Sequence, residues 1–236
     1  TERLTQLLNE SWALALFFFG YLMMAVGVNF HLSQVFFDAL AWVAAGALIQ
    51  LVVARVLVPF LFGNGFCSTC CWNGAVFDLL PHRGRRELAP WTRYLPYAVI
   101  LATLALVWLL DRSGFRTSAD AGLRRSWVLA ENGVIFAAGL ALTPLFGGRA
   151  YCRAACPFHA ISRLFAGYSV VKVGPRRGVA CKRCGRCQAV CPFHLPVAAY
   201  AAAGERVRSS DCILCERCVA ACPQGVLQLT LGRPWE

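Results

Sequence analysis

Charge is scarce in this chain. Charged residues make up 15% of its 236 residues, only 12 are acidic, and Lys172 and Lys182 are the only lysines. Hydrophobic residues make up 58%. This balance is atypical of a soluble globular domain and indicates a membrane protein. The net charge of +11 comes mostly from arginines that flank apolar runs, which favours contact with lipid headgroups over nucleic-acid binding.

Several familiar signals are absent from the sequence. No cleavable signal peptide is evident, because the first apolar run has the length of a membrane span, about 20 residues, and no small-residue cleavage site follows it. There is no flavin-attachment motif and no Cys-x2-Cys-His haem site. We therefore expect the first run to stay in the membrane and the redox chemistry to reside in the cysteines.

Four apolar runs are long enough to cross a bilayer, at about 12–30, 36–62, 94–110 and 127–146. The connectors between them pair the runs into two hairpins. Basic residues are concentrated after the second and fourth runs, and the first connector has none. The positive-inside rule therefore predicts that both chain ends lie on the cytoplasmic side.

The 13 cysteines are the most informative feature of the sequence. Two tandem runs of the form C-x2-C-x2-C-x3-C-P occupy 181–192 and 212–223. Each run supplies three thiolates to one [4Fe-4S] cluster, and in two-cluster ferredoxins its fourth Cys ligates the other cluster. The predicted ligands are Cys181, Cys184, Cys187 and Cys222 for the first cluster and Cys212, Cys215, Cys218 and Cys191 for the second. Zinc needs only four thiolates, and disulfides are uncommon in a reducing compartment, so neither alternative explains eight cysteines in this register.

Each hairpin is followed by a similar segment that contains Cys-x3-Cys. The segments 63–76 and 148–161 share a glycine-rich start, an aromatic residue before the first Cys, and an Ala and a β-branched residue at matching offsets. This duplication predicts a third iron–sulfur cluster between the repeats. Its predicted ligands are Cys67, Cys71, Cys152 and Cys156. The alternatives are a redox-active dithiol, a zinc site or unligated thiols. Cys70 is left over as a small buried hydrophobe, or it replaces Cys71 as a ligand.

These patterns predict the fold class and the domain organisation. We expect an α-helical membrane protein with four transmembrane helices in two repeated hairpins, followed by a C-terminal α+β two-cluster ferredoxin domain of the bacterial type. The predicted parts are a membrane domain at 1–158, an interfacial helix and linker at 159–178, and the ferredoxin domain at 179–236. The apolar segment 160–171 fits either a helix on the membrane surface or a packed soluble helix, and 226–231 resembles a strand.

The order of these motifs resembles a known family. A membrane hairpin with Cys-x3-Cys-Pro at 152–157, followed by the tandem cluster runs, is similar to the membrane polyferredoxins. These include the membrane iron–sulfur subunit that accompanies periplasmic nitrate reductase, the methylamine-utilisation membrane ferredoxin and the membrane portion of the nitrous-oxide-reductase regulator. The resemblance covers nearly the whole chain, although Trp72 stands where the family has Pro. It implies electron transfer between the quinone pool and other redox proteins.

From the motifs and the resemblance we expect a membrane-anchored iron–sulfur protein that passes electrons between quinol/quinone and a partner redox protein, as a subunit of a larger respiratory complex. The alternative is an accessory or regulatory redox protein that supplies electrons for maturing or activating a metalloenzyme. In the first case the chain is a component of an oxidoreductase, such as a quinol dehydrogenase. The expected partners are other subunits, quinol and the bilayer, with no nucleic acid. The expected location is a bacterial or archaeal inner membrane, multi-pass, with the ferredoxin domain on the cytoplasmic side.

A quinone site requires ionisable residues within the apolar half. The candidates are Arg55, Asp38, Glu131 and His31. Each has a simpler interpretation: the arginine would snorkel to headgroups, the acids would lie in the first turns of their helices, and the histidine would be solvated. His159 and His194 each follow Cys-Pro-Phe, where a surface position is preferred to a contact with cluster sulfur. Four basic residues among the cluster ligands would favour reduced clusters, dock an acidic partner or face solvent: Lys182, Arg183, Arg186 and Arg217.

Overall fold

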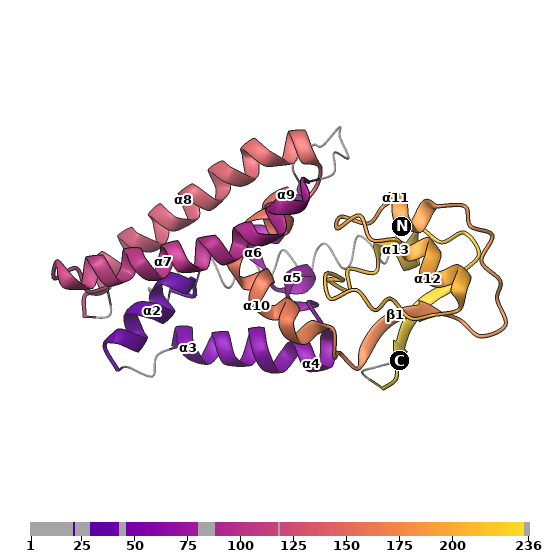
Figure 1. Ribbon diagram of the computed structural model, residues 1–236, viewed down its shortest axis with the longest axis horizontal. Helices are drawn as coiled ribbons and strands as arrows, with labels where there is room; N and C mark the ends of the chain where they lie inside the picture. The colour runs from indigo at the N-terminus through magenta and orange to yellow at the C-terminus, as the bar shows by residue number, and fades with distance from the viewer. Residues whose placement is uncertain (1–20, 22–28, 43–45, 80–87, 118, 234–236) are drawn as a thin grey trace.

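The computed structural model describes residues 21, 29–42, 46–79, 88–117 and 119–233. Figure 1 shows an elongated half built of helices and a smaller half, at the other end of the long axis, that contains the C-terminal part of the chain. The predicted first span at 12–30 lies outside the described residues apart from 21, 29 and 30.

The helix α7 (Leu95–Arg112) follows a 3-10 turn, η3 (Pro90–Tyr94), and corresponds to the predicted third span. Pro96 lies in its first turn, where a missing backbone N–H costs nothing. The segment from Pro90 to Arg112 is long and apolar enough to cross a membrane, and only 11% of its most apolar window is buried within the protein. An apolar helix so little covered by its own chain is suited to contact with lipid.

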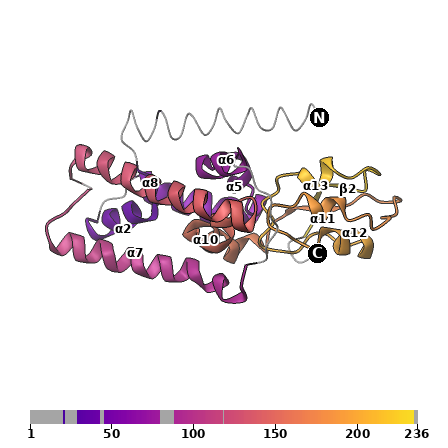
Figure 2. The same cartoon turned by 90° about the horizontal axis from the view of Figure 1, so that it is seen from above.

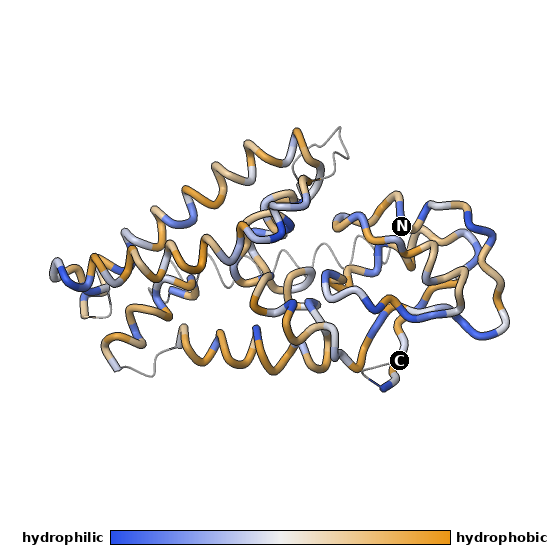
Figure 3. The backbone as a smooth tube through the Cα atoms, viewed as in Figure 1, coloured by the Kyte–Doolittle hydropathy of each residue, from blue (hydrophilic) through white to orange (hydrophobic). Residues whose placement is uncertain are grey.

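The helix α8 (Ala121–Phe146) begins six residues before the predicted start at 127. The reason is the side chain of Asp120, which accepts hydrogen bonds from the backbone N–H groups of Gly122 and Leu123 and caps the helix. This helix is also long and apolar enough to cross a membrane. Figure 2 shows α7 and α8 running along the long axis of the molecule, and Figure 3 shows that most of their length is hydrophobic.

The predicted second span at 36–62 is wrong as a single helix. The helix α2 (Leu32–Leu40) stops before Trp42, whose φ of 56° lies in the left-handed region that interrupts a right-handed helix. A separate rod then runs from 46 to 62 through α3 (Gly46–Leu51), a π-helical segment η2 (Val52–Leu57) and α4 (Val58–Phe62). The predicted four uninterrupted spans are therefore not found among the described residues.

The π-helical segment has a physical cause in Pro59. Its ring would collide with the carbonyl of the residue four positions earlier, Arg55, in a regular α-helix, and it has no N–H to donate. A wider turn before the proline relieves this collision. The same segment buries Ala54 and Arg55, so an arginine enters the interior of the apolar half.

The internal repeat is also present in the local structure. In the first copy α5 (Phe66–Thr69) precedes α6 (Trp72–Leu79), and in the second α9 (Ala150–Ala154) precedes α10 (Pro157–Ala166). In each copy the second helix starts directly after the second Cys, so Trp72 occupies the place of Pro157. The helix α10 packs against α4 and α7, with the rings of Phe60 and Phe165 5.4 Å apart, which favours the packed interpretation of 160–171.

The C-terminal half is a small sheet with short helices. Strand β1 (Val171–Pro175) pairs antiparallel with β2 (Leu227–Leu231), and the second strand confirms the strand predicted near 226–231. The helices are α11 (Arg186–Ala189), α12 (Val197–Ala203) and α13 (Arg217–Ala220). Because β1 lies within the stretch predicted to be a linker, at 159–178, the linker prediction is wrong for 171–175. Val173 on β1 is part of the core of this half, which is why the strand belongs to it.

Candidate metal centres and the adjoining cavity

Two cavities in the C-terminal half are each lined by four cysteines. The first, of about 90 Å³, is lined by Cys181, Cys184, Cys187 and Cys222. The second, of about 20 Å³, is lined by Cys191, Cys212, Cys215 and Cys218. The fourth Cys of each run thus lies with the first three of the other run. This is the grouping that the spacing predicts for two [4Fe-4S] clusters, and the ligation itself stays a prediction.

The backbone explains how each short run surrounds a cavity. Arg183 and Leu214 hold equivalent positions in the two runs, and both have φ of 52°. Gly185 and Glu216 are also equivalent, with φ of 74° and 52°, and each precedes a one-turn helix. Left-handed residues reverse the chain between cysteines, so the first three cysteines of each run line the same cavity.

Zinc geometry is not present in the described part of the chain. Four thiolates around one zinc lie about 3.8 Å apart, given a Zn–S distance near 2.3 Å and tetrahedral geometry. No three His, Cys, Asp or Glu side chains among the described residues converge closely enough to hold a single metal ion. The eight cysteines in two groups of four match the number of ligands that two [4Fe-4S] clusters need.

A larger cavity, of about 340 Å³, lies in the helical half. Four of its lining residues are the cysteines predicted for the third cluster: Cys67, Cys71, Cys152 and Cys156. Cys70 is not among the lining residues, and its Sγ lies 3.5 Å from Oγ1 of Thr69. The two Cys-x3-Cys segments therefore meet, and in the first of them Cys71, not Cys70, faces the second.

The donor set also fits a metal cluster chemically. Burial raises the pKa of the Cys152 thiol and raises the pKa of Cys156 to about 12. Such buried thiols become thiolates only beside positive charge, which iron supplies. The guanidinium of Arg55 adds to it, because Nη1 donates to Sγ of Cys67 at 3.5 Å.

Arg55 does not snorkel to the headgroups, so that expectation is wrong. Only 4% of the residue is exposed, and its guanidinium carbon lies 4.4 Å from the ring centre of Phe66 and 4.9 Å from that of Phe158. The two aromatic faces hold the cation inside the apolar half by cation–π contact. Arg55 lines the large cavity, as expected of a quinone-site candidate.

His31 and Glu131 line the same cavity, whereas Asp38 does not. His31 is buried rather than solvated, and Glu131 lies about three turns into α8 rather than in its first turn, because α8 begins at Ala121. Asp38 is buried in α2, which is not the start of a span, and its Oδ1 accepts a hydrogen bond from Nε2 of Gln34 at 2.7 Å. Three of the four candidates are thus brought together.

A buried hydrogen-bond network that was not predicted from the sequence surrounds His31 and Glu131 at one end of the cavity. Nε1 of Trp72 donates to Oδ1 of Asn132 at 3.3 Å, and Nδ2 of Asn132 lies 2.9 Å from Nε2 of His31. Nδ2 of Asn29 donates to Oε2 of Glu131 at 3.5 Å. The tryptophan in place of the family's proline was the signal that could have found this network.

Asp78, which was also not predicted as a functional residue, joins its own segment to those of Arg149 and Arg217. Its carboxylate accepts from Nε and Nη2 of Arg149, at 2.9 and 2.6 Å, and from Nη2 of Arg217 at 2.8 Å. Burial alone would raise the pKa of Asp78, but the two guanidinium groups outweigh it and hold the pKa below its usual value. Arg217 lies between the predicted cluster ligands Cys215 and Cys218, and this basic residue pairs with Asp78 within the chain.

A second contact joins the halves at the equivalent position of the other repeat. Arg163 lies 85 residues after Asp78, the same offset that relates Cys67 to Cys152. Its Nη1 lies 3.4 Å from Oδ1 of Asp211, which precedes the predicted cluster ligand Cys212. Equivalent positions in the two repeats thus carry opposite charges. Each pairs with a residue of opposite charge in the C-terminal half, residues 171–233, which we call the cluster half.

His159 also lies at the junction between the helical half and the cluster half, and it is buried, not at the surface as predicted. It is 3% exposed, its Nε2 lies 3.1 Å from Oδ1 of Asp211, and its ring centre lies 4.8 Å from that of Phe193. His194 lies with its Nε2 3.2 Å from Nη1 of Arg153. His159 therefore connects the large cavity to the C-terminal half, and His194 connects the C-terminal half to α9.

Comparison with known proteins identifies the same regions. Residues 180–227 match a family of 4Fe-4S dicluster domains, and residues 43–88 and 129–176 each match a 4Fe-4S binding domain, one for each repeat. Each of these two ranges includes one of the Cys-x3-Cys segments. No solved structure matches the chain.

Three curated relatives are similar over most of this chain. The identity is 26% over 208 residues to the putative electron transport protein YccM of Escherichia coli K12, covering 80% of this chain and 57% of the relative. It is 30% over 185 residues to the methylamine utilization ferredoxin-type protein MauN of Paracoccus denitrificans, covering 72% and 63%. It is 26% over 198 residues to the ferredoxin-type protein NapH of Escherichia coli K12, covering 79% and 69%. The chain thus spans less than two thirds of YccM and of MauN.

Proposed function

The chain belongs to the ferredoxin-type electron-transport proteins with 4Fe-4S domains, as the resemblance predicted, and from this we propose that it is a membrane-anchored conduit that passes electrons between the quinol/quinone pool and a partner redox protein. In this proposal it is a subunit of a larger respiratory complex in a bacterial or archaeal inner membrane. Its cluster half lies on the cytoplasmic side, as the distribution of arginines suggests.

The observation that carries the proposal is the convergence of four cysteines from two distant repeats on one cavity. Cys67, Cys71, Cys152 and Cys156 supply a four-thiol donor set, and both repeats match 4Fe-4S binding domains. We propose that they hold a third iron–sulfur cluster. An iron–sulfur cluster, when bound, takes up and gives back one electron at a time.

The chain's own residues would hold the three centres at fixed positions relative to one another. Asp78 and Arg217 tie the first repeat to the run at 212–223, and Arg163 and Asp211 tie the second repeat to the same run. Arg55 beside Cys67 would stabilise the negative charge that reduction adds at the membrane end. These contacts fix the third site against the cluster half, which an electron path between them requires.

Membrane anchoring is supported by the surfaces of α7 and α8. Many of their large apolar side chains face outward, among them Leu101, Trp108 and Val134. Because exposed apolar surface of this extent is unfavourable in water, we propose that both helices span the bilayer and that the rod at 46–62 and the run at 12–30 complete four spans.

The test is reduction of the clusters by quinol. The full chain, purified anaerobically with any protein that accompanies it, is placed in lipid nanodiscs and mixed with menadiol or decylubiquinol. Bleaching of the visible cluster absorption is the expected result, and clusters that stay oxidised under excess quinol but respond to dithionite would contradict the quinol link. A stoichiometric catalytic partner in the preparation supports the subunit role, whereas a metalloenzyme bound only before its maturation supports the accessory role.

A further inference from the structure

The large cavity holds polar atoms that the described parts of the chain leave unpaired. Oε1 of Gln50, Nε of Arg55 and Oδ1 of Asn73 are buried without a hydrogen-bond partner there. All three side chains line the cavity of about 340 Å³. Buried polar atoms are normally paired, and this volume falls in the range of small-molecule sites. The cavity therefore fits a ligand whose own polar groups complete these bonds.

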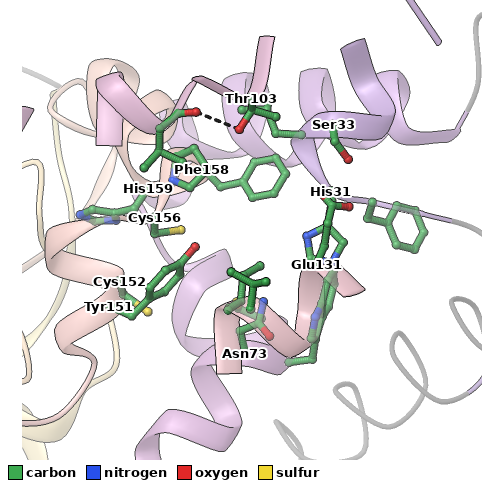
Figure 4. A pocket seen from close by; sticks show the side chains of 18 of the residues that line it. His31, Ser33, Asn73, Thr103, Glu131, Tyr151, Cys152, Cys156, Phe158 and His159 are labelled. Atoms are coloured by element: carbon green, nitrogen blue, oxygen red, sulfur yellow. Dashed lines mark hydrogen bonds between the residues drawn. The ribbon is translucent and has the colours of Figure 1, made fainter. Parts of the chain in front are cut away.

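Two opposite sides of the cavity carry chemically different side chains. Figure 4 shows Cys152 and Cys156 on one side and His31 and Glu131 on the opposite side. Apolar side chains from α7 and α8 line much of the space between. A flat ring bound there would have thiols that can hold an electron acceptor on one side and ionisable groups on the other, which suits a ligand that loses electrons and protons together.

Hydrogen-bonding rules fix the state of His31. The indole N–H of Trp72 can only donate, so the atom of Asn132 that faces it is the amide oxygen. The amide nitrogen of Asn132 then faces the carbonyl oxygen of Val128, at 2.8 Å, and Nε2 of His31. Because an amide nitrogen only donates, Nε2 of His31 is an acceptor, the ring is neutral, and its proton is on Nδ1.

His31 therefore has no free lone pair with which to take a proton, and it can only donate a hydrogen bond from Nδ1. The carboxylate of Glu131, by contrast, accepts hydrogen bonds from Nδ2 of Asn29, at 3.5 Å, and from the side chain of Ser33. Its carboxylate is the group on that side of the cavity that can receive a proton. The two residues thus have separate roles.

Building on the proposed function, we propose that this cavity binds the ring of a quinol, that Glu131 is the residue that accepts its protons, and that Trp72 and Asn132 position His31 as the hydrogen-bond donor to a ring oxygen. The four cysteines opposite would hold the electron acceptor. The site thus depends on Trp72, the position at which this chain departs from the proline of its second repeat.

The reaction balances with these groups. One O–H bond of the quinol would break, with its proton passing to the Glu131 carboxylate and its electron to an iron–sulfur group that the four cysteines would hold. Because such a group takes one electron at a time, this electron would move on to a cluster held by the tandem runs before the second transfer. Glu131 would release its proton to water, and the second O–H bond would then break in the same way. Two electrons and two protons leave, and the ring is left as the quinone.

The experiment measures the rate of cluster bleaching by menadiol in nanodiscs as a function of quinol concentration, for the full chain. Glu131→Gln should lower the saturating rate by about 100-fold or more, with little change in the half-saturating concentration, because removal of a general base costs that much. Glu131→Asp should recover part of the rate. Trp72→Phe should instead raise the half-saturating concentration several-fold, since it frees the Asn132 amide to turn and releases His31.

The matched control is Glu205→Gln, an exposed acid in the cluster half that should behave as wild type. Full reduction by dithionite verifies that each variant retains its clusters. If quinol reduces the wild type and Glu131→Gln keeps the wild-type saturating rate, the assignment of Glu131 is overturned while the proposed function stands. If Trp72→Phe leaves the half-saturating concentration unchanged, the positioning role is overturned. If quinol fails to reduce even the wild type, both proposals fall.

Discussion

Replacing Asp78 by Asn tests the junction between the helical half and the cluster half. The substitution keeps the shape of the side chain but removes the charge that Arg149 and Arg217 share. The side chain of Arg149 is only 3% exposed and that of Asp78 10%, so the guanidinium of Arg149 would be left buried without its counter-ion. Removing one partner of a buried ion pair costs about 3–5 kcal/mol.

The thermal midpoint of unfolding in detergent measures this cost. For a chain of this size, about 1 kcal/mol shifts the midpoint by roughly 2–4 °C, so Asp78→Asn should lower it by roughly 6–20 °C. Asp111→Asn is the matched control: its partner Arg116 has a side chain that is 64% exposed, and such surface pairs contribute about 0–1 kcal/mol. Arg217→Gln should fall between the two, because Arg217 is 26% exposed and Arg149 still pairs with Asp78.

The sign of the pH dependence follows from the depressed pKa of Asp78. The group contributes its stability fully above its unfolded pKa, about 3.9, and loses it only as the pH falls through the lower folded value. The difference in midpoint between wild type and Asp78→Asn should therefore be constant between about pH 6 and pH 8. A midpoint for Asp78→Asn as high as that of Asp111→Asn, or a difference that changes over this pH interval, would show that the Asp78 carboxylate does not stabilise the junction through this ion pair.

Three further outcomes are expected. Cys191→Ser should remove the cluster at 212–218 and spare the one at 181–187, read by EPR of the reduced protein; loss of the signal from the run at 181–187 instead would contradict the crossed ligation. Cys70→Ser should leave iron content unchanged whereas Cys71→Ser should lower it by about four atoms per chain, and equal effects would contradict the choice of Cys71. Gly139→Ala should lower the free energy of unfolding by about 1–3 kcal/mol, because the added methyl group would collide with the ring of Phe77. Gly133→Ala is the control, since its methyl group meets nothing within 4 Å. Equal thermal midpoints for the two variants would contradict the close packing of α6 on α8.

The tandem runs could be interpreted from sequence because their information is local. Three ligands of each cluster lie within seven residues, and only the fourth needs a rule about the partner run. The repeat was also detectable, since Cys67 and Cys71 recur as Cys152 and Cys156 at one offset. Both predictions depended on the spacing of cysteines, which can be read from the sequence alone.

Helix continuity was not predictable in the same way. Hydropathy reports that 36–62 is apolar, but it does not report that Trp42 takes a left-handed conformation or that Pro59 widens the preceding turn. Tertiary contacts decided the rest. Arg55 was expected at the headgroups because a lone cation in an apolar run usually leaves it, and two aromatic rings kept it inside.

The sequence contains the charged residues that join the helical half to the cluster half, but their pairing was not predicted from it. Asp78 and Arg163 occupy equivalent positions of the repeat with opposite signs, which indicates a function that differs between the copies. What could not be seen was their partners, because Arg217 and Asp211 are far away in the sequence and only the fold brings them near. The same holds for Asn132, which looks like an ordinary polar residue in an apolar helix until Trp72 and His31 are placed beside it.

We propose three iron–sulfur centres in this chain, one of them between its two repeats. The most direct test is iron and acid-labile sulfide per chain in anaerobically purified full-length protein, with Cys67→Ser/Cys152→Ser as the comparison. The wild-type protein should contain about twelve iron and twelve sulfide per chain, and the double variant about eight of each. About eight in the wild type, unchanged in the double variant, would show that the cysteines of the two repeats hold no four-iron cluster.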